Sequence, residues 1–138
     1  SENYNKNELE ALAHLAGNIT NSGKGYTFSF ITDEFYQSWR AARRPDSDLK
    51  MACEDFVDRY IRNFESNQWG FLVSPEPMSG DDWWGVSLRA ISGAKDVSAV
   101  ARALGGGGHK PAAGAKIQAN SVQEALEQVK EAIATTSP

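Results

Sequence analysis

The residues with the clearest chemical potential lie in one segment, residues 105–114, with the sequence GGGGHKPAAG. Consecutive glycines let backbone N–H groups approach a ligand closely and adopt positive φ angles without steric cost. Such amides can form a concave nest for an anion, to which His109 adds a titratable donor and Lys110 a positive charge. Pro111 suits the first turn of a short helix, whose free amides would face the same anion. The segment predicts a phosphate or carboxylate pocket at Gly106, Gly107, Gly108, His109 and Lys110.

A second interpretation of this segment is a flexible glycine-rich linker. The residues that follow argue against it, because Ala112, Ala113 and Gly114 are small and suit tight packing, whereas linkers usually continue with polar residues. The P-loop pattern for phosphate does not fit, because His109 stands where a glycine should precede the lysine. Chemistry alone leaves both the pocket and the linker open.

Arg89 is a further candidate for binding an anion. Residues 83–91 alternate as a strand, with Ser87 and Arg89 on the face opposite the apolar side chains. An unpaired charge on a mostly buried sheet is unfavourable, so this arginine needs an anionic partner. We expect either an ion pair with Glu76 or Asp82, or a phosphate held by both arms of the guanidinium.

The composition is that of an ordinary globular domain. The chain has 138 residues, of which 41% are hydrophobic and 23% are charged, and its net charge is −4. Residues 85–116 differ from the rest, since they contain five cationic side chains and one anionic side chain. A local basic patch on an acidic body favours a small anionic ligand over nonspecific binding of nucleic acid.

The single cysteine, Cys53, predicts a cytoplasmic protein without an internal disulfide. It lies in the apolar stripe of a helix expected over residues 47–64, which predicts a buried thiol without chemistry. No apolar run is long enough to span a membrane. The two histidines, His14 and His109, belong to no cluster with metal-ligand spacing, so we expect no metal site in this chain.

The pattern of the whole chain predicts a single α/β domain, with a mixed β-sheet of about four or five strands flanked by helices. Helices are expected over residues 7–18, 33–43, 47–64, 97–104 and 122–134. Strands are expected over residues 26–32, 69–74, 83–91 and 115–118, of which the second and third can pair as a hairpin.

An aromatic row marks the first of these strands. Tyr26, Phe28 and Phe30 share one of its faces. We expect these rings to form part of the core; the alternative is a platform on which nucleobases stack.

Three motifs together resemble the DHH-associated domain, the C-terminal half of DHH-family phosphoesterases. Residues 105–114 are similar to the family signature GGGGH-x-x-AAG, and Val86-Ser87-Leu88-Arg89 resembles its V-S-L-R-S strand. Residues 96–101 resemble the D-V-x-x-I-A helix between the two. The sequence departs from the pattern at Ala90, where hydrolases of short RNA and of bisphosphorylated nucleotides usually carry serine.

The resemblance implies a division of labour between two domains. Residues 21–138 would form the substrate-binding domain, and residues 1–20 a helix or linker from an upstream DHH domain. Manganese or magnesium would be held in that DHH domain, so this chain would contain no catalytic residue and would be inactive alone. Arg89 and His109 would grip phosphate oxygens, with Ser87, Ala112, Ala113 and Gly114 in support.

The implied ligands are short RNA, a cyclic dinucleotide or a phosphorylated nucleotide, and the implied protein partner is the DHH domain, with a homodimer as a further possibility. Two alternatives stay open. One is a stand-alone module that binds nucleotides or RNA without catalysis. The other is the related C-terminal domain of alanyl-tRNA synthetases, which has a glycine-rich stretch but not typically the form that includes His109.

Overall fold

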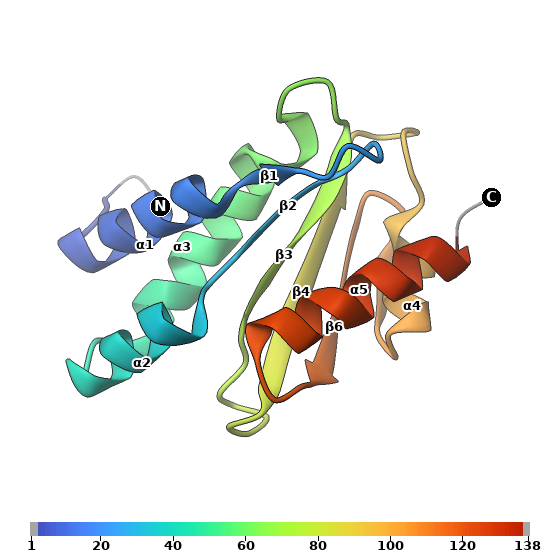
Figure 1. Ribbon diagram of the computed structural model, residues 1–138. Coiled ribbons are helices and arrows are strands. Elements are labelled where there is room, and N and C mark those ends of the chain that lie inside the picture. The colour runs from blue at the N-terminus through green and yellow to red at the C-terminus, as the bar shows by residue number, and fades with distance from the viewer. Residues whose placement is uncertain (1–2, 137–138) are drawn as a thin grey trace.

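The computed structural model describes residues 3–136, with helices on both sides of one sheet (Figure 1). The helices are α1 (Lys6–Asn18), α2 (Asp33–Ala41), α3 (Asp46–Arg59), the 3-10 helix η1 (Ile61–Asn63), α4 (Val97–Ala103) and α5 (Val122–Thr136). The strands are β1 (Thr20–Asn21), β2 (Thr27–Phe30), β3 (Trp69–Pro75), β4 (Trp83–Ala90), β5 (Gly107–His109) and β6 (Ala112–Gln118). The predicted α/β class is confirmed. None of the helices in this described range is long and apolar enough to cross a membrane.

The sheet is mixed, with the strand order β1-β2-β3-β4-β6-β5. Only the neighbours β2 and β3 run parallel, and the connection between them passes through α2, α3 and η1. Strands β3 and β4 form the predicted hairpin. The sheet has six strands where four or five were predicted, because the two-residue β1 and the glycine-rich β5 carry no apolar alternation.

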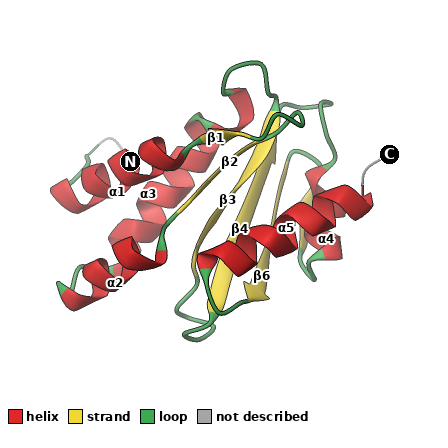
Figure 2. Cartoon of the chain, in the orientation of Figure 1, coloured by secondary structure: helices red, strands yellow, loops and turns green. Residues whose placement is uncertain are grey.

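Helices α4 and α5 cover one face of the sheet (Figure 2). The aromatic row lies under them: Tyr26 and Phe28 are buried, and Phe71 on β3 is fully buried. The rings of Phe28 and Phe71 stack with their centroids 5.4 Å apart. The row therefore belongs to the core, which confirms the first of the two interpretations of these rings.

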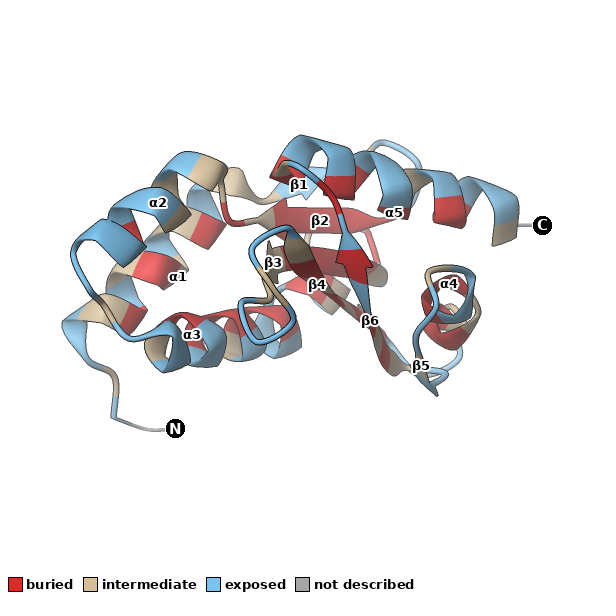
Figure 3. Ribbon diagram, turned by 90° about the horizontal axis from the view of Figure 1, so that it is seen from below, coloured by how far each residue is buried: buried red, intermediate tan, exposed pale blue. Residues whose placement is uncertain are grey.

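Helices α1, α2 and α3 pack on the other face, and Figure 3 shows buried positions where helices meet the sheet. Ala11 and Leu15 of α1 are fully buried in this second core, together with Trp39 of α2 and Leu72 of β3. Helix α1 thus contributes packing to this domain. The assignment of residues 1–20 to an upstream domain stays a prediction, and residues 1–2 and 137–138 of the predicted ranges lie outside the described residues.

Helix α3 ends earlier than the sequence predicts. The helix was expected to continue to residue 64, but Tyr60 leaves the helical region with φ −120°. Ile61 is still fully buried because η1 carries it back toward the sheet. The helical spacing of apolar residues therefore continues beyond the end of α3, and it does not show where the helix ends.

His14 joins α1 to the start of α2 in its neutral form. Its Nε2 accepts the N–H of Thr32 at 3.1 Å and the side-chain amide of Asn18 at 3.2 Å. The imidazole also stacks on Phe35, with the ring centroids 3.9 Å apart. Burial lowers the pKa of His14 from its ordinary value of 6.5.

We expect the free energy of unfolding to fall as the pH drops below about 6.5, because the unfolded chain then takes up a proton at His14 before the folded chain does. Urea unfolding at pH 7.5 and pH 5.5 measures the decrease. His14→Gln should remove the part of this decrease that His14 causes. An equal decrease in wild type and His14→Gln would contradict the prediction.

Candidate functional site

The glycine run first ends helix α4. Gly105 has φ 86°, and its N–H donates to the carbonyl of Arg102 at 3.0 Å. The N–H of Gly106 donates to the carbonyl of Ala101 at 2.8 Å. These two bonds form a Schellman motif, which satisfies carbonyls that the helix end would leave free. A side chain is excluded at Gly106, because a Cβ there would lie 2.1 Å from the carbonyl oxygen of Gly114.

The second half of the run forms strand β5, and the short helix predicted at Pro111 is absent. Pro111 lies instead in a two-residue turn between β5 and β6, and its carbonyl accepts the N–H of Ala90 on β4. Strand β6 lies between β4 and β5, and the backbone N–H and C=O groups of its successive residues point alternately to one and to the other. By this alternation Gly107 and His109 pair with β6, and Gly108 directs its N–H to the open sheet edge.

The segment therefore offers fewer free amides than the predicted nest. The amides of Gly105 and Gly106 are bonded within the helix end, and those of Gly107 and His109 face β6. Only the N–H of Gly108 among these five faces outward. The flexible-linker interpretation is also wrong, since the segment is hydrogen-bonded along its length. Whether the segment binds an anion stays a prediction.

A cleft of about 840 Å³ opens on the sheet face opposite α4 and α5. Helix α3 and the loop between β3 and β4 supply its walls, and β4 and β6 supply its floor. On the floor, Ser87 lies opposite Gly114, and Gly85 lies opposite Lys116. The cleft exists because this part of the sheet carries small side chains where α3 does not cover it.

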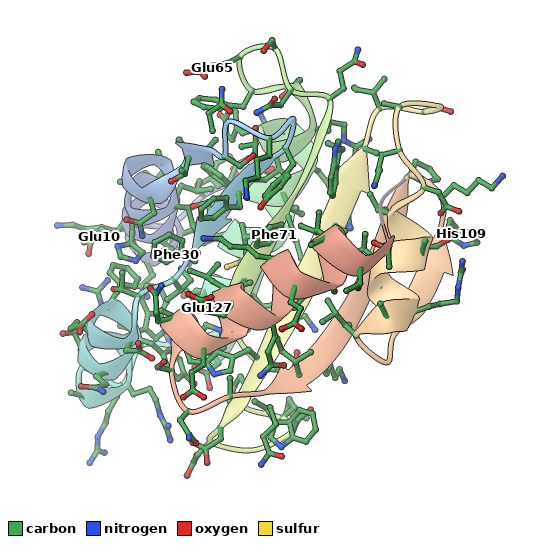
Figure 4. The ribbon with its side chains drawn as sticks, turned by 45° about the vertical axis from the view of Figure 1, so that its right-hand side comes forward. Glu10, Phe30, Glu65, Phe71, His109 and Glu127 are labelled. Carbon is green, nitrogen blue, oxygen red and sulfur yellow. The ribbon has the colours of Figure 1, made fainter. Side chains whose placement is uncertain are left out.

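Four of the predicted site residues line the cleft, namely Ser87, Arg89, Gly106 and Gly114. The others do not line it. Gly107, Gly108, His109 and Lys110 form the outer hairpin, and Figure 4 shows His109 at the edge of the molecule. Ala112 follows in β6, where it lies opposite Arg89, and Ala113 is buried toward α4. The structure thus divides the predicted set between a cleft and an exposed edge.

Arg89 has a carboxylate partner, but not one of the two predicted. Its Nε donates to Oδ1 of Asp58 on α3 at 2.8 Å, and its Nη1 donates to the carbonyl of Leu88 at 3.0 Å. Glu76 and Asp82 do not pair with it. The partner was missed because Asp58 stands 31 residues earlier, and only the packing of α3 beside β4 brings the two together.

The cleft also contains charged residues that sequence reasoning missed. The charged lining residues not predicted as part of the site are the cations Lys50 and Lys116 and the carboxylates Asp46, Glu54 and Glu76. Of these, Glu76 had been considered only as a partner of Arg89. The sequence contained a pattern that could have identified some of these lining residues. Asp46, Lys50 and Glu54 recur every four residues, which puts them on one stripe of α3 beside the apolar stripe. Lys116 follows Gly114 by two residues and so shares its face of β6.

Cys53 lies on α3, lines the cleft and is 6% exposed. Burial raises the pKa of its thiol to about 12, against a smaller opposing effect of a hydrogen bond with Ser74. A thiol with so high a pKa has almost no thiolate at neutral pH. The prediction that Cys53 is buried is confirmed.

Solved structures share this fold at low sequence identity. An exopolyphosphatase-related protein from Bacteroides fragilis superposes with a TM-score of 0.74 and 16% identity, over 96% of this chain and 36% of that one. A pGpG-specific phosphodiesterase from Vibrio cholerae superposes with a TM-score of 0.56 and 12% identity, over 96% of this chain and 40% of that one. CDC45 from Entamoeba histolytica superposes with a TM-score of 0.57 and 12% identity, over 95% of this chain and 27% of that one. No curated protein matches the sequence.

These likenesses show the fold alone, and the chain spans between 27% and 40% of the length of those proteins. The family comparison is more specific. The profile of the DHHA1 domain matches residues 41–135, a range that contains β4, α4 and the whole glycine hairpin. The match covers well over half of the sequence, and it includes every residue that the motifs had singled out. This chain therefore belongs to the DHHA1 domain family.

Proposed function

We propose that this domain recognises the substrate of a DHH-family phosphoesterase, and that it holds the phosphate of a short oligoribonucleotide or a linear or cyclic dinucleotide. The observation that carries the proposal is the cleft floor, where Arg89 and Ser87 of the motif strand meet Gly106 and Gly114 of the glycine signature. Two motifs that are separate in the sequence thus line one cavity. The cavity is large enough for a small nucleotide ligand.

The geometry of Arg89 supports a role in binding phosphate. Asp58 and the carbonyl of Leu88 engage Nε and Nη1, which fixes the orientation of the guanidinium plane. Its Nη2 makes no hydrogen bond within residues 3–136. A guanidinium held on one side with donors free on the other suits the planar, charge-assisted recognition of phosphate oxygens.

Hydrolysis itself belongs to another domain in this proposal. Cleavage of a phosphodiester at neutral pH needs an activated water, which bound metal ions commonly supply. The part of the chain that the structure describes contains no group of three or more His, Cys, Asp or Glu side chains that could hold a metal ion. We assign manganese or magnesium to the upstream DHH domain, as the family resemblance implies, and recognition to this one.

The test compares Arg89→Ala with Asp58→Asn in the binding of a 5′-phosphorylated diadenylate, followed by NMR titration of the 138-residue chain. Arg89→Ala should weaken binding at least tenfold, since a hydrogen bond to a charged group contributes about 1.5–3 kcal/mol. Asp58→Asn removes the charge of the partner but keeps a side-chain oxygen that can accept the Nε–H, so the guanidinium stays oriented and most of the affinity should be retained.

Thermal melts separate this role from a structural one. The Arg89 side chain is 21% exposed and that of Asp58 is 57% exposed, so solvent reaches the pair from the Asp58 side and we expect it to contribute about 1 kcal/mol to folding. Both variants should therefore melt within a few degrees of wild type. Equal affinities for Arg89→Ala and wild type would show that Arg89 serves only the ion pair, and would overturn the proposal.

A further inference from the structure

The cleft is lined by as many carboxylates as cations. The cations are Lys50, Arg89 and Lys116, and the carboxylates are Asp46, Glu54 and Glu76. A bound phosphate accounts for the cations, but it would be repelled by a carboxylate beside it. Asp46 accepts a hydrogen bond from the Tyr36 hydroxyl at 3.5 Å. Glu54 and Glu76 are therefore the carboxylates that suit a different part of the ligand, one that is uncharged and donates hydrogen bonds.

Glu76 is the carboxylate best placed to meet such a group. It is half-buried, and its Oε1 lies 3.5 Å from the position that a Cβ on Gly85 would occupy, so the carboxylate stands over the cleft floor. The side chain makes no hydrogen bond or ion pair with any described residue. Gly85 precedes Arg89 by four strand residues, which places the two ends of the floor roughly 14 Å apart.

Apolar surface lies at the same end of the cleft as Glu76. Met78, in the loop between β3 and β4, is 91% exposed, and Tyr36 of α2 lines the same cavity. Arg40 ties the two elements together, because it stacks 5.5 Å from the centre of the Tyr36 ring and lies 3.7 Å from Asp81 in the loop. A carboxylate that lines the same cavity as an aromatic ring and a thioether suits a flat group with apolar faces and a polar edge.

We propose that this end of the cleft is a nucleobase subsite in which Glu76 selects guanine. The inference rests on the proposed function, since it assigns the other end of the same ligand. Guanine presents two adjacent donors, N1–H and the N2 amino group, to the two oxygens of a carboxylate. Adenine presents one amino group beside the acceptor N1, which a carboxylate repels. Met78 and Tyr36 supply apolar surface for the faces of the base.

The experiment measures the affinities of two linear 5′-phosphorylated dinucleotides, one with two guanines and one with two adenines, by NMR titration of the labelled chain. The wild-type chain should bind the guanine ligand about tenfold more tightly. Glu76→Gln should bring the ratio of the two affinities close to one, because an amide cannot accept both donors. Glu54→Gln removes another lining carboxylate and should leave the ratio unchanged.

Arg89→Ala, measured in the same series, separates this inference from the proposed function. If that variant weakens both ligands while Glu76→Gln leaves their ratio unchanged, the base subsite is overturned and phosphate recognition stands. If neither dinucleotide shifts the signals of the cleft residues at millimolar concentration, both are overturned. If Glu54→Gln rather than Glu76→Gln abolishes the preference, the assignment to Glu76 is wrong.

Discussion

Replacing Gly106 with alanine is expected to lower the free energy of unfolding by about 1–3 kcal/mol or more, the usual range for forcing extra atoms into a packed site. The added Cβ would lie 2.1 Å from the Gly114 carbonyl oxygen and 2.7 Å from Ala115 Cα. Both are backbone atoms, so the clash cannot be relieved by turning a side chain. Either β6 moves or the Schellman motif at the end of α4 opens. Urea denaturation followed by circular dichroism measures the loss.

Gly107→Ala is the matched control for this prediction. A Cβ at Gly107 meets no atom within 4 Å, and its φ lies outside the left-handed region. The substitution adds the same methyl group one residue further along the chain, and we expect it to change stability by less than about 0.5 kcal/mol. Equal losses from the two variants would show that the glycine run is selected for flexibility rather than for close contact.

Phe71→Ala should destabilise the domain by about 3–5 kcal/mol, the range for removing a large aromatic side chain from a core. Phe71 is fully buried and touches the rings of Tyr26 and Phe28, with centroids 5.8 Å and 5.4 Å away. Because small domains are stable by about 5–15 kcal/mol in total, a loss of this size is a large fraction of the stability of the domain. Its denaturation midpoint in urea provides the measurement.

Phe30→Ala removes the same side-chain atoms from the C-terminal end of the aromatic row on β2. Phe30 is only partly buried, and Figure 4 shows both side chains. The decrease in the free energy of unfolding should be well under half of that for Phe71→Ala, since less apolar surface returns to water. If Phe30→Ala proved as harmful as Phe71→Ala, the core would extend further toward the C-terminal end of β2 than the burial of these residues indicates.

The sequence predicted the elements well where apolar spacing was regular. The hairpin of β3 and β4 and the helices α4 and α5 follow directly from their patterns, and the motifs identified the family. The predicted elements were wrong where glycine leaves no side-chain pattern to interpret. Residues 107–109 have no side-chain alternation, so nothing marked them as a strand, and Pro111 was read as a helix start although it turns the hairpin.

The candidate site was predicted only in part, for a different reason. Ser87, Arg89, Gly106 and Gly114 line one cavity because strand pairing places them on the same face, and pairing between β4 and β6 cannot be seen in a single sequence. The Asp58 partner of Arg89 comes from a helix on that face. Local patterns specify which residues a strand or helix exposes, but the neighbours of those residues are set by tertiary packing.

Helix α5 has a consequence for how this protein is made. It follows every strand of the sheet in the sequence, yet it covers the aromatic face, where Lys130 Nζ lies 4.8 Å from the centre of the Phe28 ring. Its first turn is held by Asp33, whose carboxylate accepts the N–H of Val122 at 3.2 Å. A nascent chain that has left the ribosome only as far as β6 therefore exposes Phe28 and Phe71 to water. Exposed apolar surface of this kind promotes aggregation, so we expect the nascent chain to need protection by chaperones until α5 emerges and docks.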